Sequence, residues 1–233
     1  MKSLQSSEII NELEIRIQKL FESESSGHDF QHIHRVRRVA LELSKTEGGD
    51  PFVIELIALL HDVGDWKFHD RGLQGQADIL STFLADFDIN DDLCNRLITE
   101  IPKIGYKGSG VEEGELSLES RIVRDADRLD AIGALGIARC FAYGGNKGLP
   151  IFDPDIPIEK HFSSQAYHGA KPPSIHHFFE KLLLLKRRLH TDSAKKLAEN
   201  RHQFLIQFLQ QFFSEWYGDE IVPKQFCLKE FEV

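Results

Sequence analysis

Apolar residues recur at helical spacing along almost the whole of this 233-residue chain. Ile9, Leu13, Ile17 and Leu20 follow one another at intervals of four, four and three, which places them on one face of a first helix. Val36 and Val39 mark the inner face of a second helix, which is predicted over 30–45. No convincing alternating pattern of a β-strand interrupts this series, so the sequence predicts an all-α fold.

Helix boundary signals divide the rest of the chain. Asp50 followed by Pro51 is typical of a helix start, because an N-cap residue precedes proline at the first helical position, and it predicts a third helix through Val63. Further helices are predicted over 73–86, 91–101, 118–142, 174–190 and 193–216. The glycine-rich segment 102–117 and the longer segment 143–173 are predicted as loops, and a loop as long as the second is usually functional.

The length of the chain is compatible with one large domain. We expect a single helical bundle over 1–233, with a core at about 27–214 and a C-terminal tail at 217–233. A domain boundary at the long loop near 143–173 is the alternative, although the helices on both sides resemble parts of one bundle.

Charge and cysteine usage restrict the class of protein. The formal net charge is −9, which disfavours binding to nucleic-acid backbones because phosphate repulsion would be uncompensated. A small phosphorylated substrate stays possible, since a few local cations or a metal ion can reverse the field in a cleft. Cys94, Cys140 and Cys227 form no Cys-x-x-Cys pair, which favours a reducing, cytoplasmic location. We expect no secretion signal and no membrane partner.

Ionisable residues stand on faces where apolar residues are expected. His32 shares the inner face of the second helix, and His61-Asp62 closes the most apolar helix of the chain. A charged carboxylate in such a place is costly unless it is paired or bound to a cation. A lone inward histidine can also be an ordinary core residue whose hydrogen bonds are satisfied. The pairs His28-Asp29 and His69-Asp70 are interpreted mainly as helix-start residues.

Asp127 adds a third helix to this set. It shares a predicted helical face with the apolar Val123, Ala131 and Ala134 and with Asp130, although a salt bridge to Arg124 or Arg128 is an alternative. His32, His61, Asp62 and Asp127 could therefore converge. Two imidazoles and two carboxylates suit one divalent ion, and we expect Mn²⁺, with Ni²⁺, Co²⁺, Fe²⁺, Mg²⁺ and Zn²⁺ as alternatives.

Four sequence motifs in this order resemble the HD superfamily of metal-dependent phosphohydrolases, in particular small bacterial members thought to act on nucleotides. They are HIHRV at 32–36, LLHDVGD at 59–65, RDADRLDAIGA at 124–134 and YGGNKG at 143–148. The resemblance implies an all-helical HD-type domain with one metal ion held by the four residues above. It also implies hydrolysis of a phosphoester or phosphoanhydride.

Within this subgroup the preferred expectation is hydrolysis of a nucleoside triphosphate to a monophosphate and pyrophosphate. Alternatives are a 5′-nucleotidase activity, a non-catalytic metal or nucleotide sensor on the same scaffold, and a structural helical protein without metal. The chain departs from the HD-x-G-K pattern of dinuclear phosphodiesterases, because Asp65 stands where those proteins have lysine. Hydrolysis of cyclic dinucleotides is therefore disfavoured.

The remaining roles concern the substrate. Asp65 is the candidate acid or base that orients or deprotonates the attacking water. Lys107, in the glycine-rich segment, and with less weight Arg128 and Lys147, are candidate contacts to the phosphates. Asp130 is a further candidate at the substrate, or support for a second ion. We expect a small nucleotide as the partner and a monomer or homodimer as the assembly.

Overall fold

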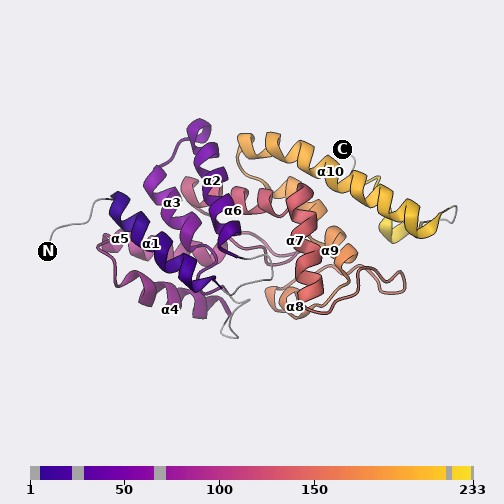
Figure 1. Cartoon of the computed structure of the whole chain (residues 1–233), viewed down its shortest axis with the longest axis horizontal. Coiled ribbons are helices and arrows are strands. Elements are labelled where there is room, and N and C mark those ends of the chain that lie inside the picture. Colours follow the sequence, from indigo (N-terminus) through magenta and orange to yellow (C-terminus); the bar gives the residue numbers. More distant parts are fainter. Residues whose placement is uncertain (1–5, 23–28, 66–71, 219–221, 232–233) are drawn as a thin grey trace. The chain divides into compact units, whose positions relative to one another are not determined.

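A computed structural model describes residues 6–22, 29–65, 72–218 and 222–231. Every regular element within these ranges is a helix, which confirms the predicted all-α class (Figure 1). None of the described helices is both long enough and apolar enough to cross a membrane. The chain divides into two compact units, one formed by Met1–Tyr106 and Glu113–Asp127, the other by Lys107–Glu112 and Arg128–Val233. The expectation of a single domain over 1–233 stays a prediction.

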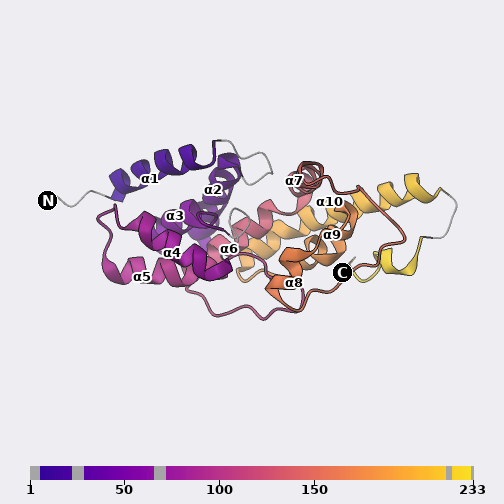
Figure 2. The same ribbon diagram turned by 90° about the horizontal axis from the view of Figure 1, so that it is seen from below.

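The first unit contains the helices that carry the predicted metal ligands. Its elements are α1 (Ser6–Leu20), α2 (Phe30–Glu47), α3 (Pro51–Leu60), α4 (Gly72–Leu84), α5 (Asp91–Glu100), the 3-10 helix η2 (Ile101–Lys103) and most of α6 (Leu118–Asp130). α2 and α3 lie side by side, as both Figure 1 and Figure 2 show, and α1 packs on α3. Seven of the ten residues of α3 are buried, so this helix is the centre of the unit's apolar core.

Capping residues fix where α2 and α3 begin. Asp29 accepts a hydrogen bond from the backbone N–H of His32 at 2.8 Å, and Asp50 accepts one from Phe52 N–H at 2.9 Å. Both N-cap predictions are therefore confirmed for these helices. The corresponding prediction for Asp70 falls outside the described residues.

The predicted helix over 118–142 is wrong as a single element. α6 ends at Asp130, and α7 (Gly133–Asn146) begins after an extended residue, Ile132. Gly133 has a φ of +77°, which side-chain-bearing residues rarely adopt, and a Cβ there would lie 3.1 Å from Cβ of Arg201. The glycine therefore breaks the helix, although the apolar spacing on its two sides looks continuous.

The second unit contains the remaining elements. They are α7, α8 (Ser164–Gly169), α9 (Ser174–Glu180), the 3-10 helix η3 (Leu182–Arg188), α10 (Asp192–Tyr217) and the 3-10 helix η4 (Lys224–Phe226). The predicted loop at 143–173 is thus shorter than expected, since α7 runs into it and α8 lies inside it. The predicted helix at 174–190 is also wrong as one helix, because Lys181, with φ −140° and ψ −63°, separates α9 from η3.

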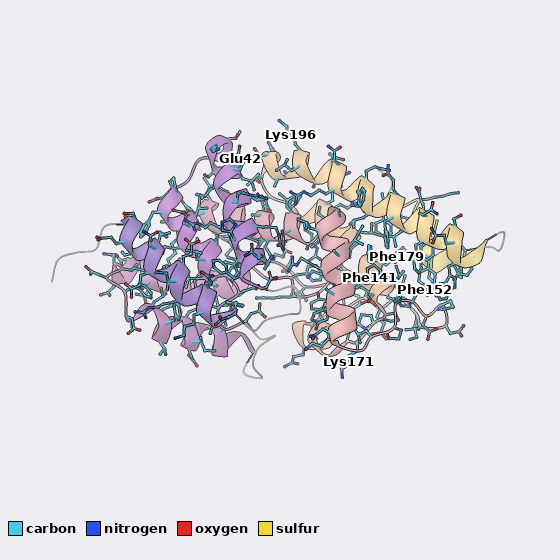
Figure 3. All side chains as sticks on the ribbon, viewed as in Figure 1. Glu42, Phe141, Phe152, Lys171, Phe179 and Lys196 are labelled. Carbon is cyan, nitrogen blue, oxygen red and sulfur yellow. The ribbon has the colours of Figure 1, made fainter. Side chains whose placement is uncertain are left out.

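Aromatic rings fill the core of this second unit (Figure 3, labels Phe141, Phe152 and Phe179). The ring of Phe226 lies 4.9 Å from that of Phe152 and 5.7 Å from that of Phe179, between centroids. Phe226 is only 1% exposed. Part of the segment 217–233, predicted as a tail, therefore packs into the aromatic core of the unit.

His177 makes the stability of the protein sensitive to acid. Burial first, and then the nearby Lys181 and His161, lower its pKa from 6.5 to about 3. Below about pH 6.5 the unfolded chain binds a proton at His177, whereas the folded chain does so only near pH 3, so acid favours the unfolded chain. The contribution of His177 to the free energy of unfolding is therefore complete above pH 6.5 and is lost as the pH falls towards 3. We expect the wild type to lose about 1–2 kcal/mol more than His177→Gln between about pH 7 and about pH 5. Urea unfolding of both proteins at both pH values measures this difference, and equal losses would contradict it.

Candidate metal centre

His32 comes from the first turn of α2. Its side chain is fully buried, and the cap at Asp29 fixes its backbone at the start of the helix. His34, two residues later, is exposed on the outer side of the same helix. The helical period therefore aims one imidazole inward and the other outward.

His61 and Asp62 lie in the tight turn that follows α3. This helix ends at Leu60, three residues earlier than the predicted end at Val63, and Val63 N–H donates to Leu60 O at 2.9 Å. Gly64 then takes a φ of +67°, and a Cβ on it would lie 2.9 Å from the side chain of Ile79. The turn therefore requires glycine, and it lets the adjacent His61 and Asp62 face the same point, which a continuing helix would not allow.

Gln76 of α4 holds this turn from outside. Its side-chain amide donates to His61 O at 3.1 Å and to Val63 O at 3.3 Å, and it is only 3% exposed. The sequence prediction did not identify Gln76. A buried glutamine in a mainly apolar helix is the signal that could have found it, because a buried amide needs partners.

The orientation of the His61 ring is set by the backbone of α3. Nδ1 lies 2.7 Å from Ala58 O, so Nδ1 carries the proton and donates it to this carbonyl. Nε2 is then left as the acceptor nitrogen. Such a hydrogen bond on the far nitrogen is typical of a histidine that binds a metal through the other nitrogen.

Four possible metal-binding atoms, from α2, the turn after α3 and α6, lie close together around Nε2 of His32. Its Nε2 lies 3.3 Å from Nε2 of His61, 3.5 Å from Oδ2 of Asp62 and 3.4 Å from Oδ1 of Asp127. Nε2 of His61 and Oδ2 of Asp62 are 3.7 Å apart. The structure therefore brings together all four residues that the sequence proposed as ligands.

These spacings fit one small cation. Two donors about 2.1 Å from the same ion are about 3.0 Å apart at a right angle and about 3.4 Å apart at the tetrahedral angle. His32, His61 and Asp127 each offer one donor atom, and these atoms all lie within 4.8 Å of one another. Two neutral imidazoles and two carboxylates also supply the two negative charges that a divalent ion balances. The donor set therefore fits a divalent metal ion.

Asp127 is the most open member of the group. Its side chain is 25% exposed, whereas the side chains of His32, His61 and Asp62 are at most 5% exposed. Water therefore has access to this group at the carboxylate of Asp127. Asp127 was also predicted to share a face with Ala131 and Ala134, which is wrong because α6 ends at Asp130.

Asp65, the candidate acid or base, closes the same turn. Its backbone N–H donates to Asp62 O at 3.2 Å, and the residue is 7% exposed. Its Oδ2 lies beside Gly105, because a Cβ added to this glycine would be 4.0 Å from Oδ2 of Asp65. Asp65 is therefore placed by the turn, and not by a continuation of α3.

Arg128 and Asp130, two of the candidate substrate contacts, make contacts inside the second unit. Nη1 of Arg128 donates to the backbone carbonyl of Arg188. Asp130 forms an ion pair with Arg139 at 2.8 Å. Both are almost fully buried, and their roles at the substrate stay predictions.

Lys107 and Lys147 are more accessible. Lys107 is partly buried, and Lys147 is exposed at the end of α7, with its Nζ 5.8 Å from the ring centroid of Tyr143. Both residues belong to the second unit, and their contacts to a substrate stay predictions as well.

Comparison with known proteins identifies the family. The sequence model of the HD domain matches residues 29–132, a span that contains the four donor residues and Asp65. The YpgQ protein of Bacillus subtilis is 35% identical over 212 residues, which cover 91% of this chain and 94% of YpgQ. The crystal structure of YpgQ in complex with ADP superimposes with a TM-score of 0.67 at 32% identity and covers 93% of this chain and 99% of its own.

Two further solved structures agree with this result. A protein from Lactobacillus plantarum has a TM-score of 0.81 at 33% identity and covers 91% of this chain and 98% of its own. An HD-superfamily hydrolase from Bacillus thuringiensis has a TM-score of 0.66 at 37% identity and covers 93% of this chain and 100% of its own. A donor group suited to a divalent ion thus lies inside a matching HD domain, and relatives match along most of the chain. The protein belongs to the HD superfamily of metal-dependent phosphohydrolases.

Proposed function

We propose that this protein hydrolyses nucleoside triphosphates to a monophosphate and pyrophosphate. The observation that carries the proposal is the group formed by His32, His61, Asp62 and Asp127. Asp65 lies in the turn that also carries His61 and Asp62. The ADP complex of YpgQ supports a nucleotide as the substrate, since that relative resembles this chain along nearly its whole length.

His32, His61, Asp62 and Asp127 hold the metal ion in this proposal. When bound, a divalent ion lowers the pKa of a coordinated water and polarises a phosphoryl oxygen. We propose Mn²⁺, because two imidazoles with two carboxylates form a mixed nitrogen and oxygen donor set, and Ni²⁺, Co²⁺, Fe²⁺, Mg²⁺ and Zn²⁺ are the alternatives to be compared. Asp127 is the member of the donor group nearest to solvent.

Asp65 acts on protons in this proposal. A water that attacks phosphorus must lose a proton, and the leaving oxygen must gain one or be stabilised otherwise. Asp65 follows Asp62 in a turn that Gly64 and Gln76 fix, so the backbone that carries its carboxylate is held. A carboxylate on a held backbone is suited to orient the water in line with the leaving group and to accept its proton.

Lys107 provides a positive charge for the phosphates in this proposal. The chain carries a net charge of −9, so a local cation is needed to offset its repulsion of a phosphorylated substrate. We expect Lys107→Ala to raise KM for a nucleoside triphosphate about tenfold, with a smaller change in kcat, because one phosphate contact is lost. Lys196→Ala is the matched control, since Lys196 is exposed on α10 (Figure 3). Steady-state kinetics of the three proteins measure the effect. An unchanged KM in Lys107→Ala would remove this residue from the proposal.

Product identification tests the reaction. Protein freed of metal by a chelator and then supplied with Mn²⁺ is incubated with a panel of ribo- and deoxyribonucleotides. Pyrophosphate released from triphosphates supports the proposal, whereas orthophosphate released from monophosphates indicates a 5′-nucleotidase. Nucleotide binding without turnover, with each of the six metals, would instead indicate a sensor. Repeating the assay with each metal identifies the preferred ion.

A further inference from the structure

Arg188 holds the backbone of the loop that carries Lys107. This loop, residues 107–110, is called the glycine loop here, and it belongs to the second unit together with η3. Nη1 of Arg188 donates to Gly108 O at 3.2 Å, and Nη2 donates to Ser109 O. One guanidinium therefore binds two successive carbonyl groups, which lie 80 and 79 residues away in the sequence.

The direction of these carbonyls determines what the opposite side of the loop offers. In a trans peptide the C=O and the following N–H point in opposite directions. With Gly108 O directed at Arg188, the N–H of Ser109 points away from the guanidinium. The loop therefore keeps the carbonyl oxygens of Gly108 and Ser109, which would repel a phosphate, on the Arg188 side, and the N–H of Ser109 on the other.

His161 fixes the loop from a second direction. Its backbone O accepts from Gly110 N–H at 3.0 Å, and its N–H donates to the Ser109 hydroxyl oxygen at 3.2 Å. Gly108 has a φ of +126°, and an added Cβ would lie 2.8 Å from His161 O. The loop thus has one conformation that only glycine at 108 permits without displacement.

Arg188 is itself held in place. Its backbone carbonyl accepts a hydrogen bond from Arg128, which is 2% exposed. Arg188 is partly buried at the last residue of η3, whereas the preceding Arg187 is exposed and donates to Glu230 O at 2.8 Å. The two neighbouring arginines therefore both bind backbone carbonyls, but only Arg188 binds the glycine loop.

We propose that Arg188 is a positioning residue for Lys107, and that it acts by holding the glycine loop so that the Lys107 ammonium can meet the phosphates of the nucleotide. This inference rests on the proposed function, because it assigns Lys107 to the substrate. It predicts that the effect of Arg188 on nucleotide affinity passes through Lys107.

A double-mutant cycle tests this dependence. Arg188→Ala is expected to raise KM for the nucleoside triphosphate and Kd for ADP about fivefold to tenfold, with a smaller change in kcat. In Lys107→Ala the same replacement is expected to add less than about twofold, because the loop has already lost the group that it positions. If the fold-changes of the two single variants multiply in the double variant, the inference is overturned. An unchanged KM and Kd in Arg188→Ala would also overturn it.

Two further variants separate position from charge and from folding. Gly108→Ala displaces the glycine loop without changing any charge, and it should weaken binding with the same dependence on Lys107. Arg187→Ala removes a neighbouring arginine of the same chemistry and should leave KM and Kd unchanged. Circular dichroism and thermal unfolding show whether each variant is folded. A Gly108→Ala effect that is independent of Lys107, or an Arg187→Ala effect as large as that of Arg188→Ala, would contradict the inference.

The Kd measurements make the two hypotheses separable. A wild type that binds ADP without turnover refutes the proposed function, and the cycle in Kd still tests Arg188. A wild type that releases pyrophosphate, with independent effects of Arg188 and Lys107, supports the proposed function and refutes the inference.

Discussion

Replacing His32 with alanine is expected to remove the bound divalent ion and, with it, the hydrolytic activity. Nε2 of His32 lies 3.3–3.5 Å from the donor atoms of His61, Asp62 and Asp127, so it is the member that contacts all the others. Loss of a group that only orients a ligand lowers metal affinity about 10–100-fold, so loss of a ligand should exceed about 100-fold. Elemental analysis of protein equilibrated with Mn²⁺ and then desalted measures the content directly.

His34→Ala is the matched control for this prediction. It removes the same side chain from the same helix two residues later, but His34 is exposed. His34→Ala should therefore keep the metal content and the turnover of the wild type. His32→Gln serves as a second variant that fills more of the buried space than alanine does, and it should also lose the ion. Metal retained at wild-type level by folded His32→Ala would refute the proposed ligand set.

Local sequence patterns were sufficient to place the two histidines. The spacing of His32 from Val36 and Val39 predicts an inward position, and the structure buries His32 completely. The apolar character of α3 likewise predicts that His61 closes a buried helix, and His61 is 4% exposed. These predictions succeed because burial of one helical face depends on residues within a few turns of each other.

Features that depend on distant residues could not be predicted in this way. At Gly64 a side chain would collide with Ile79 of α4, and Gln76 reaches the turn from fifteen residues away. Arg188 reaches the glycine loop across eighty residues. Helical periodicity carries no information on such contacts, since they depend on how the elements pack together.

The break between α6 and α7 was missed by the sequence prediction for a different reason. The segment around Gly133 retains apolar and small residues at helical spacing, so the pattern predicted one helix. A positive φ at Gly133 and the close approach of Arg201 are tertiary effects that override this local preference. Because of this error, Ala131 and Ala134 were predicted to share the helical face of Asp127, although Asp127 itself was assigned to the correct helix.

Replacing Asp65 with asparagine is expected to lower kcat by about 10²–10⁴ while the metal content stays at the wild-type level. Asparagine has nearly the same shape as aspartate, and the backbone N–H of residue 65 would keep its hydrogen bond to Asp62 O. The amide, however, does not accept a proton from water at neutral pH. Asp88→Asn is the control, because Asp88 is an exposed carboxylate of the same unit.

The two substitutions test different parts of the same candidate metal centre, and their combination is informative. His32→Ala should abolish turnover together with the ion, whereas Asp65→Asn should leave an ion-loaded protein that binds nucleotide with little change in Kd. A wild-type kcat in Asp65→Asn would mean that Asp65 only completes the turn after Gly64. A low kcat accompanied by lost metal would mean that Asp65 supports the metal ligands instead. A low kcat with the ion retained and the affinity preserved agrees with a role in proton transfer, because the substitution keeps the shape of the side chain and removes its basicity.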